Sequence, residues 1–384
     1  MVDMNHFGET LRKYRKEQRI TQWELAEKLM VSPQSVSIWE SGKGLPDLDH
    51  LCELSKVLSV SVDVLLNQRP DGMRGLIGID GGGTKTEFAL IDETGRSLNS
   101  IVLEGSNPNV HGMEQAVDVI RRGIDFLRPG EMKVMGVFLG GAGMGGGTNG
   151  DMMRTALQKI YPELKVDCAN DILDVIACCT QPDNCIAAIS GTGCVVYAHH
   201  KGQLHRVGGA GYLFEGRGSG YDMGREAITA ALRARDGIAP RTTLTDLVEE
   251  KLGGNPWDFI HDLYKRDVSY IASFSPLVSR AAGEGDRLAQ SILEQGSEHL
   301  AKEIRQARVF APEARHVILS GSLFVKDDRF FHAVAQRLDG DLTVERMSCP
   351  PVWGACLQCA KLCGLEKMPS QSLYMQTRGP QPKV

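Results

Sequence analysis

The 384-residue sequence has no run of eighteen apolar residues, and no apolar stretch follows a basic start at its N-terminus. We therefore expect neither a membrane-spanning helix nor a secretory signal, and we predict a cytoplasmic protein with no membrane partner. The ten cysteines lack the density and regular spacing of a secreted disulfide framework, so we interpret them as reduced thiols. A chain of this length exceeds what one hydrophobic core usually supports and predicts two or three domains.

One group of cysteines could bind a metal. Cys356, Cys359 and Cys363 could hold zinc or an iron-sulfur cluster, because three thiolates can supply ligands. Their spacing is also that of one helix face, and their neighbours are alanines and leucines. Cysteine is among the most buried residue types, so we favour core packing.

The first seventy residues lack an excess of basic side chains. They hold nine Lys and Arg against ten Asp and Glu, a net charge of −1. Affinity for nucleic acid of arbitrary sequence is therefore expected to be modest. Five of the nine cations lie in residues 12–19, which predicts a local basic edge that could neutralise backbone phosphates.

The same seventy residues show helical patterns and no strand pattern. Thr21 and Glu24 can form a capping box in front of one helix. Ser32 and Pro33 can begin the next helix, which runs through Trp39. Two short helices on a tight turn are the geometry with which many proteins read DNA.

This region resembles the XRE family of Cro and phage-repressor type helix-turn-helix domains. The segment that carries the match is ITQWELAEKLMVSPQSVSIWESGKGLPDLDHLCELSKVLSVSVDVLL. The resemblance implies an all-α DNA-binding domain over residues 1–68, which we expect to act as a dimer on a two-fold operator in double-stranded DNA. The residues expected at base edges are Gln34, Ser35 and Ser37, and those expected at phosphates are Gln22 and Lys43. A solvated helix face, or a helical domain that binds protein, is the alternative.

A polar hinge at residues 69–75 precedes a change to strands broken by glycines. Two apolar strands are predicted on either side of the turn DGGGTKT at residues 80–86. Glycines let backbone amides approach an anion, and Thr84 and Lys85 add a hydroxyl group and a cation. Asp80 can hold a hydrated divalent metal. The alternative is a glycine-rich hairpin turn with a surface lysine.

A second glycine turn lies in a similar context. Apolar strands are predicted at residues 185–189 and 194–198, with Ser190, Gly191, Thr192 and Gly193 between them. Two such loops, one in each half of an α/β domain, could hold a nucleotide phosphate chain from both sides. Amphipathic helices are expected between the strands, at residues 114–127 and 154–161.

Residues 75–365 resemble the N-acetylglucosamine kinase and BadF/BadG/BcrA/BcrD ATPase branch of the actin-like, sugar-kinase superfamily. The stretches that carry the match, in family order, are IGIDGGGTKTEFALID, GSNPN, CANDILDVIA, AAISGTGCVVYA, GGAGYLFEGRGSGYDMGREAI, VILSGSLF and PPVWGA. The resemblance implies a two-lobed α/β actin-like (ribonuclease H-like) ATPase domain. We expect its lobes at residues 76–180 and 181–368, and a flexible tail at residues 369–384.

The resemblance also implies residue roles. Its nucleotide-binding positions fall on Asp80, Gly82, Gly83, Thr84, Lys85, Ser190, Gly191, Thr192, Gly193, Gly321 and Ser322. Among them, Asp80 would hold Mg²⁺ through water, and Gly321 with Ser322 would contact adenosine. Asn107 matches an asparagine that touches the sugar, and Asp171 an acidic residue of the segment that joins the lobes. ATP with Mg²⁺ is therefore the expected cofactor, and the cleft between the lobes the expected ligand site.

The catalytic carboxylate of the kinases is difficult to find in this chain. Kinase chemistry needs a carboxylate beside the acceptor hydroxyl to orient it and take its proton. Where the family places an aspartate, this chain has Gly143 or Met144. The nearest candidate is Asp151, which is more simply interpreted as the N-cap of a helix beginning at Met152.

A second departure lies in the family stretch GDEGSGY. Its acidic pair is replaced by Gly216 and Arg217, and Glu215 is the candidate to take over the role. An arginine here favours an anionic ligand, such as a sugar phosphate.

We therefore predict a DNA-binding transcriptional regulator that senses a nucleotide, an amino sugar or a sugar phosphate, and that works as a homodimer. Loss of a catalytic base slows chemistry but does not prevent ligand binding. One alternative is an active ATP-dependent N-acetylglucosamine or amino-sugar kinase with a DNA-binding arm. A third function to consider is that of an activator ATPase of a radical dehydratase, a class that holds an iron-sulfur cluster between its subunits. Cys168, Cys178 and Cys179 of this chain do not match the cysteine positions of that class.

Overall fold

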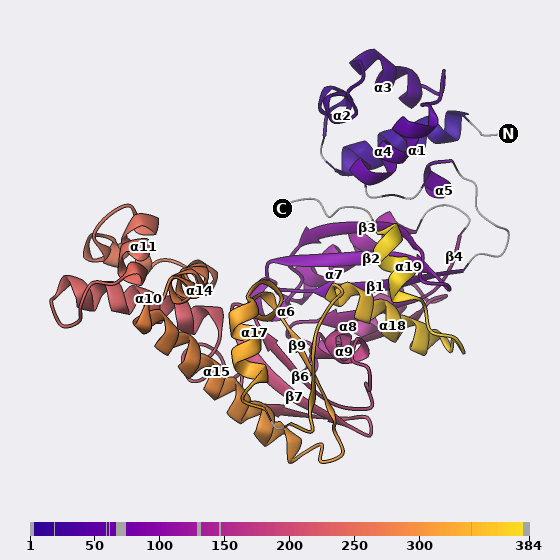
Figure 1. Ribbon diagram of the computed structural model, residues 1–384. Coiled ribbons are helices and arrows are strands. Elements are labelled where there is room, and N and C mark those ends of the chain that lie inside the picture. The colour runs from indigo at the N-terminus through magenta and orange to yellow at the C-terminus, as the bar shows by residue number, and fades with distance from the viewer. Residues whose placement is uncertain are drawn as a thin grey trace. The chain divides into compact units, whose positions relative to one another are not determined.

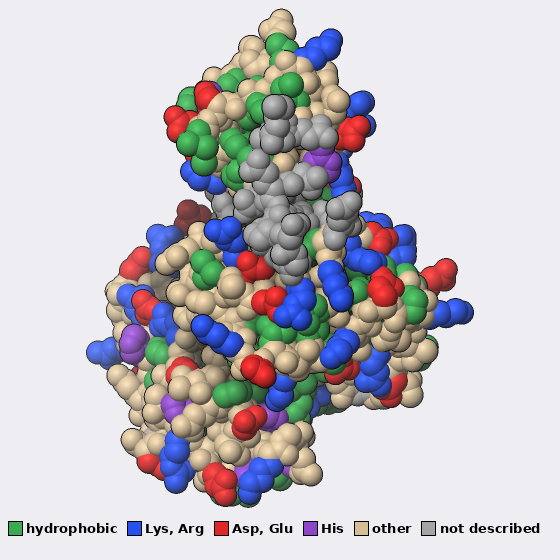
Figure 2. Space-filling model, turned by 90° about the vertical axis from the view of Figure 1, so that its right-hand side faces the viewer, with side chains coloured by type: hydrophobic (Ala, Val, Ile, Leu, Met, Phe, Trp, Pro, Cys, Tyr) green, Lys and Arg blue, Asp and Glu red, His purple; other side chains and the backbone are tan. Residues whose placement is uncertain are grey.

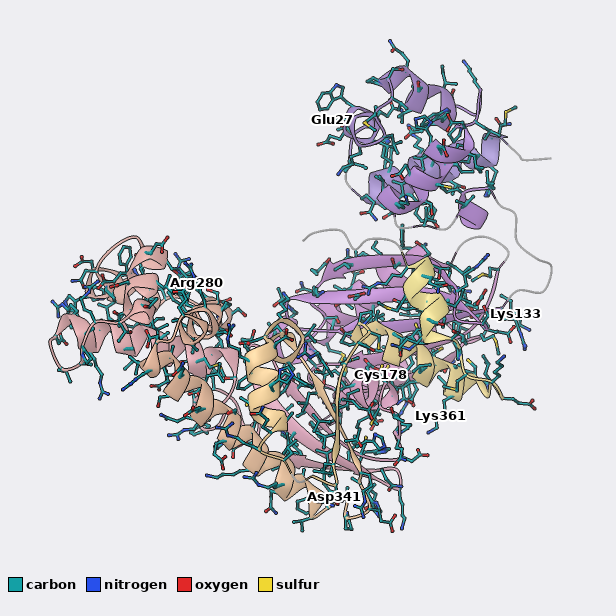
Figure 3. The ribbon with its side chains drawn as sticks, in the orientation of Figure 1. Glu27, Lys133, Cys178, Arg280, Asp341 and Lys361 are labelled. Atoms are coloured by element: carbon teal, nitrogen blue, oxygen red, sulfur yellow. The ribbon has the colours of Figure 1, made fainter. Side chains whose placement is uncertain are left out.

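The computed structural model describes residues 4–18, 20–58, 60, 62–66, 74–128, 132–145, 147–338 and 340–378 (Figure 1). The chain divides into two compact units. Unit 1 combines residues 1–177 with 349–384, and unit 2 spans residues 178–348 and begins at Cys178, which is labelled in Figure 3. Among the helices of the described residues, none is both long enough and apolar enough to cross a membrane.

The N-terminal part of unit 1 is a group of five helices, here called the reader domain. They are α1 (Met4–Glu17), α2 (Gln22–Lys28), α3 (Pro33–Glu40), α4 (Leu48–Leu58) and α5 (Val62–Leu65). The predicted caps are confirmed: Thr21 and Glu24 form a capping box on α2, and the Ser32 side chain accepts a hydrogen bond from the backbone of Ser35. Trp39 is buried, whereas Trp23 is 61% exposed.

A five-stranded mixed sheet forms the centre of the rest of unit 1. Its strands are β1 (Arg74–Gly81), β2 (Lys85–Asp92), β3 (Ser97–Glu104), β4 (Lys133–Gly141) and β5 (Lys165–Asn170), in the order β3-β2-β1-β4-β5. The β1–β2 and β2–β3 pairs are antiparallel, whereas β4 pairs parallel with both β1 and β5. The helices of this part are α6 (Pro108–His111), α7 (Met113–Leu127), α8 (Asn149–Ile160), α9 (Ile172–Ala177), α18 (Pro351–Cys363) and α19 (Gln371–Thr377).

Unit 2 repeats the same sheet. Its strands are β6 (Asn184–Ser190), β7 (Cys194–His200), β8 (Gln203–Val207), β9 (His316–Ser320) and β10 (Thr343–Arg346), in the order β10-β9-β6-β7-β8. Its helices are α10 (Gly220–Arg235), α11 (Thr243–Leu252), η1 (Pro256–Phe259), α12 (Ile260–Leu263), α13 (Val268–Ala272), α14 (Ser275–Gly283), α15 (Arg287–Arg308), α16 (Ser322–Lys326) and α17 (Asp328–Ala335). Each sheet therefore begins with an antiparallel hairpin around a glycine turn, and this duplication confirms the predicted two-lobed fold.

The C-terminal part of the chain differs from the sequence prediction. We expected α18 in the second lobe, but it packs against β1 and β4 of unit 1, where the backbone at Cys356 leaves no room for a Cβ atom on Gly78. Cys356, Cys359 and Cys363 lie buried along α18, as the core-packing interpretation predicted. The expected flexible tail contains α19, whose Tyr374 is fully buried and stacks on Trp353 with ring centroids 4.8 Å apart. Residues 379–384, and residues 69–73 of the expected hinge, lie outside the described residues.

Candidate functional site

The first glycine loop closes the β1–β2 hairpin. The Gly82 amide donates to the Lys85 carbonyl (2.9 Å), and Gly83 is exposed with open space around it, so the loop backbone is accessible to a ligand. Thr84 and Lys85 are also exposed. A Cβ atom on Gly105 would lie 2.0 Å from the Gly83 carbonyl oxygen, so the segment after β3 must pass directly against the loop. Gly105 is the first residue of the stretch GSNPN, but the sequence alone assigns it no role.

Asp80 lies next to the last residue of β1, beside this loop, and is half-buried. Burial raises its pKa to about 7, and the charges of Glu87 and Asp171 act in the same direction, whereas Lys85 opposes them. Because burial and neighbouring negative charges disfavour the ionised form of Asp80, a bound cation would stabilise that form. The described residues contain no group of three or more ligating side chains that could hold a metal alone. A hydrated magnesium ion at Asp80 therefore stays a prediction, in which water and nucleotide phosphates would supply most of the ligands.

Asn107 lies at the start of α6, where its Oδ1 accepts a hydrogen bond from the Asn109 amide (2.9 Å). Gly143 faces it: a Cβ atom on Gly143 would lie 2.4 Å from Asn107 Oδ1. The structure therefore places a glycine, with φ of +82°, beside the expected sugar-binding residue. Gly143 and the buried Met144 are the two positions at which the kinases are expected to carry a carboxylate, and neither side chain is acidic.

Asp151 does not fill this vacancy. It lies in the first turn of α8, and the N-cap of this helix is Thr148. The prediction that Asp151 is the N-cap was therefore wrong. The Asp151 side chain is 71% exposed and paired with Arg154. Asp171, by contrast, is half-buried directly after β5, and burial raises the pKa of its carboxyl group.

The second glycine loop and the adenosine turn meet within unit 2. The Gly191 amide donates to the Gly193 carbonyl (2.9 Å), and a Cβ atom on Gly191 would lie 3.6 Å from the Ser322 hydroxyl. Gly321 has φ of +96°, and a Cβ atom there would lie 2.3 Å from the Ser190 carbonyl oxygen. Only glycine allows this approach. Two of the three predicted nucleotide segments are therefore adjacent.

These two segments border a cavity of about 370 Å³. Thr192 and Ser322 line it together with side chains that sequence reasoning missed, namely Ser269, Ser273, Ser275, Ser279, Lys326 and Asp327. The missed serines come from the region of α13 and α14, where no loop motif marks them. The cavity has the size of a small-molecule site and is rich in hydrogen-bonding groups.

Glu215 and Arg217 do not line this nucleotide cavity. The Glu215 carboxylate accepts a hydrogen bond from the Ala210 amide (2.9 Å) and so holds its own loop together. Arg217 lines a separate cavity of about 380 Å³ between α10 and α15, together with Arg225 and Arg233. Arg217 therefore lines a different pocket of unit 2 from the cavity that the predicted nucleotide segments border.

The reader domain presents α3 to solvent. Gln34 and Ser37 are exposed on it, as expected for side chains that meet base edges, and Lys43 is exposed just beyond it. Ser35 is less available, because its hydroxyl group lies 2.9 Å from that of Ser32 within the helix cap. Gln22 is also less available for a phosphate contact, because its side-chain amide donates a hydrogen bond to the Glu40 carboxylate (2.7 Å).

The basic edge at residues 12–19 is weaker than the sequence predicts. Arg15 is buried and forms a two-pronged ion pair with Glu40, and it also donates to the Ile20 carbonyl (2.7 Å). It therefore stabilises the reader domain and is withdrawn from phosphates. On the face drawn in Figure 2, Lys and Arg side chains are interspersed with Asp and Glu.

A comparison with protein-family models decides the family of this chain. Residues 77–348 match the model of the BadF/BadG/BcrA/BcrD ATPase family, and residues 11–65 match a helix-turn-helix model. The chain belongs to the BadF/BadG/BcrA/BcrD ATPase family. Both segments lie where the sequence predicted them, so the fused organisation is confirmed.

Relatives of the BadF-type part are kinases of amino sugars. The chain is 27% identical over 257 residues to an N-acetylmuramic acid/N-acetylglucosamine kinase from Clostridium acetobutylicum, a match that covers 65% of this chain and 84% of that protein. The helix-turn-helix part is 46% identical over 61 residues to the HTH-type transcriptional activator BcrR from Enterococcus faecalis, which covers 16% of this chain and 30% of BcrR.

Solved structures agree on the fold of this BadF-family chain. A Chromobacterium violaceum structure assigned as an N-acetylglucosamine kinase superposes with a TM-score of 0.60 at 22% identity, covering 75% of this chain and 99% of that one. A ROK family transcriptional regulator, a homologue of the E. coli MLC protein, covers 98% of both chains with a TM-score of 0.52 at 13% identity. The latter likeness extends over the whole chain, reader domain included.

Proposed function

We propose that this BadF-family chain is a transcriptional regulator whose kinase-like domain binds a nucleotide together with an amino sugar or sugar phosphate, and whose reader domain binds operator DNA as part of a homodimer. The observation that carries the proposal is the glycine at position 143. It faces Asn107, where a kinase would need its catalytic carboxylate, while both glycine loops and the adenosine turn are retained. Such a chain keeps the binding functions that a sensor needs and loses a group that only turnover needs.

The choice of ligand rests on two features. Asn107 projects from the segment that passes against the first phosphate loop, so a sugar held there would lie close to a bound nucleotide. Kinases of N-acetylated amino sugars are among the relatives, which favours an amino sugar over other sugars.

The second candidate is an active amino-sugar kinase with a DNA-binding arm. It is supported by Asp80, which fits a hydrated magnesium ion, and by the exposed Thr84 and Lys85. The names of the relatives favour it as well. A carboxylate brought in by a movement of the chain could replace the missing base, so the two candidates must be separated by measuring turnover.

The deciding experiment is calorimetric titration of the full chain. ATP with magnesium would be added first, and then N-acetylglucosamine, glucosamine or their 6-phosphates, with ADP formation followed in the same samples. Binding without sugar-dependent ADP formation is the expected result. Turnover that depends on the sugar would identify a kinase instead, and absence of binding to every one of these ligands would reject both candidates.

A further inference from the structure

Strand β3 is the edge of the first sheet, and a segment of the reader domain covers part of that edge. Val60, which follows α4, forms an isolated antiparallel bridge with Asn99 in the middle of β3. At the start of the strand, the Ser97 amide donates to the Thr377 hydroxyl of α19 (2.8 Å). An edge strand otherwise presents unpaired backbone groups to other chains, so covering it stabilises the folded unit. The reader domain therefore covers part of this edge of the sheet.

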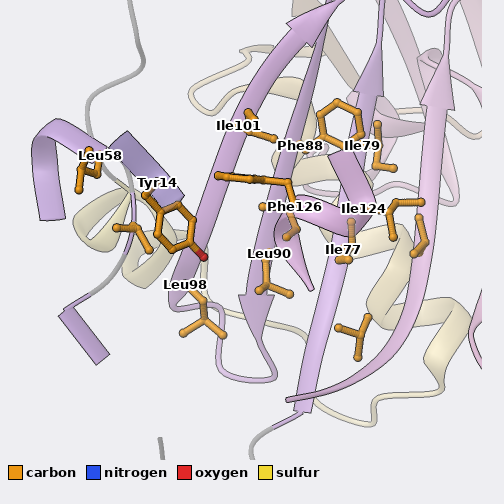
Figure 4. Packing of buried hydrophobic residues seen from close by; sticks show 14 of the residues in the cluster. Tyr14, Leu58, Ile77, Ile79, Phe88, Leu90, Leu98, Ile101, Ile124 and Phe126 are labelled. Atoms are coloured by element: carbon orange, nitrogen blue, oxygen red, sulfur yellow. The ribbon is translucent and has the colours of Figure 1, made fainter. Parts of the chain in front are cut away.

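Side chains extend this contact. The Asn99 side-chain amide donates to the Tyr14 hydroxyl (3.1 Å), and the Tyr14 ring lies edge-on to Phe126 of α7 with centroids 5.1 Å apart (Figure 4). Together with Val60, these residues form a contact that we call the dock, which consists of Tyr14, Val60, Asn99 and Phe126. All four side chains are almost fully buried. Tyr14 belongs to α1, so the dock joins the first helix of the reader domain to the sheet of the BadF-type domain.

The two elements of the BadF-type domain that form the dock also flank Asn107. From Asn99, the chain follows β3 to its end at Glu104 and reaches Asn107 three residues later. It then passes through α6 and α7 to Phe126. At about 1.5 Å per residue, α7 is about 20 Å long, so it links the Asn107 segment to a distant contact as one rigid element. A displacement of the Asn107 segment would therefore reach the dock by two routes.

We propose that the dock transmits ligand binding at Asn107 to the reader domain by shifting its attachment to β3 and α7. The idea rests on the proposed sensor function. The dock leaves the DNA-facing helix free, because Gln34 and Ser37 of α3 are exposed while the dock is formed. Regulation would therefore act on the orientation of the reader domain and not by covering its DNA surface.

The first test asks whether the dock exists in solution. Partners in an antiparallel bridge have Cα atoms about 4.5–5.5 Å apart, within the range that a disulfide spans. The double variant Val60→Cys/Asn99→Cys should therefore form an intramolecular disulfide under mild oxidation of the full chain, detected by mass spectrometry after digestion. Each single variant is the control for the native cysteines. Failure of the new pair to form would overturn the dock, whatever the protein senses.

The second test measures coupling. Operator duplexes would be selected from random sequence with the wild-type full chain, and their Kd measured with and without ATP-magnesium plus N-acetylglucosamine. Tyr14→Phe removes the hydroxyl group and keeps the ring, and should lower the ligand-induced change in Kd about twofold to tenfold, the effect of one hydrogen bond. Tyr161→Phe is the matched control, because its hydroxyl group contacts Asp125 of the same helix α7 (2.6 Å).

The outcomes separate the two proposals. A wild-type Kd that does not respond to the ligands would reject the sensor and, with it, the coupling role of the dock, even if the disulfide forms. The wild-type Kd could instead change with the ligands, and change equally in Tyr14→Phe or in the disulfide-locked double variant. That result would overturn the coupling role of the dock and leave the sensor function intact. The expected result is a locked protein whose Kd no longer changes with ligand, and whose response returns on reduction.

Discussion

Asp174 is an acidic side chain enclosed in the apolar interior of unit 1. It lies on α9 with none of its surface exposed, and neither carboxyl oxygen has a hydrogen-bond partner among the described residues. Two glycines make room for it, since a Cβ atom on Gly140 would lie 1.8 Å from the carboxyl group and one on Gly354 would lie 1.8 Å from the Asp174 carbonyl. Burial raises its pKa well above the ordinary value, and Asp80 and Asp171 add to the shift.

The substitution Asp174→Asn should raise the stability of unit 1, increasingly so at high pH. Because the pKa of Asp174 is raised on folding, its contribution to stability is greatest below pH about 4 and is lost as the pH rises toward the folded pKa. The slope for one proton is about 1.4 kcal/mol per pH unit. Opening free energies of the β4 amides, measured by hydrogen exchange at pH 5.5 and 7.5, should favour the variant more at 7.5. An equal difference at both values would show that Asp174 is not held protonated.

Gly321 sets the position of the adenosine turn. The substitution Gly321→Val should abolish nucleotide binding, because the added Cβ atom would lie 2.3 Å from the Ser190 carbonyl oxygen and the backbone has φ of +96°. The matched control is Gly340→Ala, where a Cβ atom meets nothing within 4 Å. Calorimetric titration with ATP-magnesium measures both. Unchanged affinity in Gly321→Val would place the nucleotide elsewhere than in the cavity at Ser322.

Helix α19 is a short polar element that packs against the buried part of unit 1. Tyr374 fills the space over Trp353, and Arg378 forms an ion pair with the buried Glu87 (2.7 Å). The helix therefore joins the end of the chain to β2. Its Tyr374 hydroxyl group is buried without a partner among the described residues, so the ring and not the hydroxyl group stabilises the contact.

Two substitutions separate the ring of Tyr374 from its hydroxyl group. Tyr374→Ala should cost about 3–5 kcal/mol of the free energy of unfolding, the usual loss for a large buried aromatic side chain. Tyr374→Phe should be neutral or stabilising by up to about 1–3 kcal/mol, because an unpaired buried hydroxyl group is removed. Met375→Ala, on the exposed side of the same helix, is the control. Hydrogen exchange of the β2 amides provides the measurement. If Tyr374→Ala were as stable as this control, the docking of α19 would be rejected.

The elements that the sequence predicted well are those that carry a local signal. The caps at Thr21 and Ser32 and the strands around both glycine turns are determined by residues close in sequence, and the structure has them. The misplaced elements depend on distant partners. α18 returns to unit 1 because it packs on β1, and α19 is ordered by Trp353. Neither partner is visible from local periodicity, and the same holds for the serines that line the nucleotide cavity.

At the scale of the whole molecule, the distribution of charge sets how the chain can meet DNA. The total net charge is −5, and the first seventy residues contribute −1. Arg15 is occupied by Glu40, so the reader domain loses one of its nine cations for phosphate contacts. A single reader domain without a net positive charge would bind weakly. Two reader domains on one operator would double those contacts, which is why a homodimer suits this chain.

The salt dependence of DNA binding can count the reader domains. Each phosphate contact contributes about −0.9 to the slope of log K against log salt. If Lys43 holds a phosphate, Lys43→Ala should reduce the slope by about 1 for one bound reader domain and by about 2 for a symmetric dimer. Lys201→Ala, on a hairpin of unit 2, should leave the slope unchanged. Fluorescence anisotropy of a selected operator duplex at several salt concentrations measures all three proteins. A change of about 1 would contradict the dimer, and no change would remove Lys43 from the DNA contact.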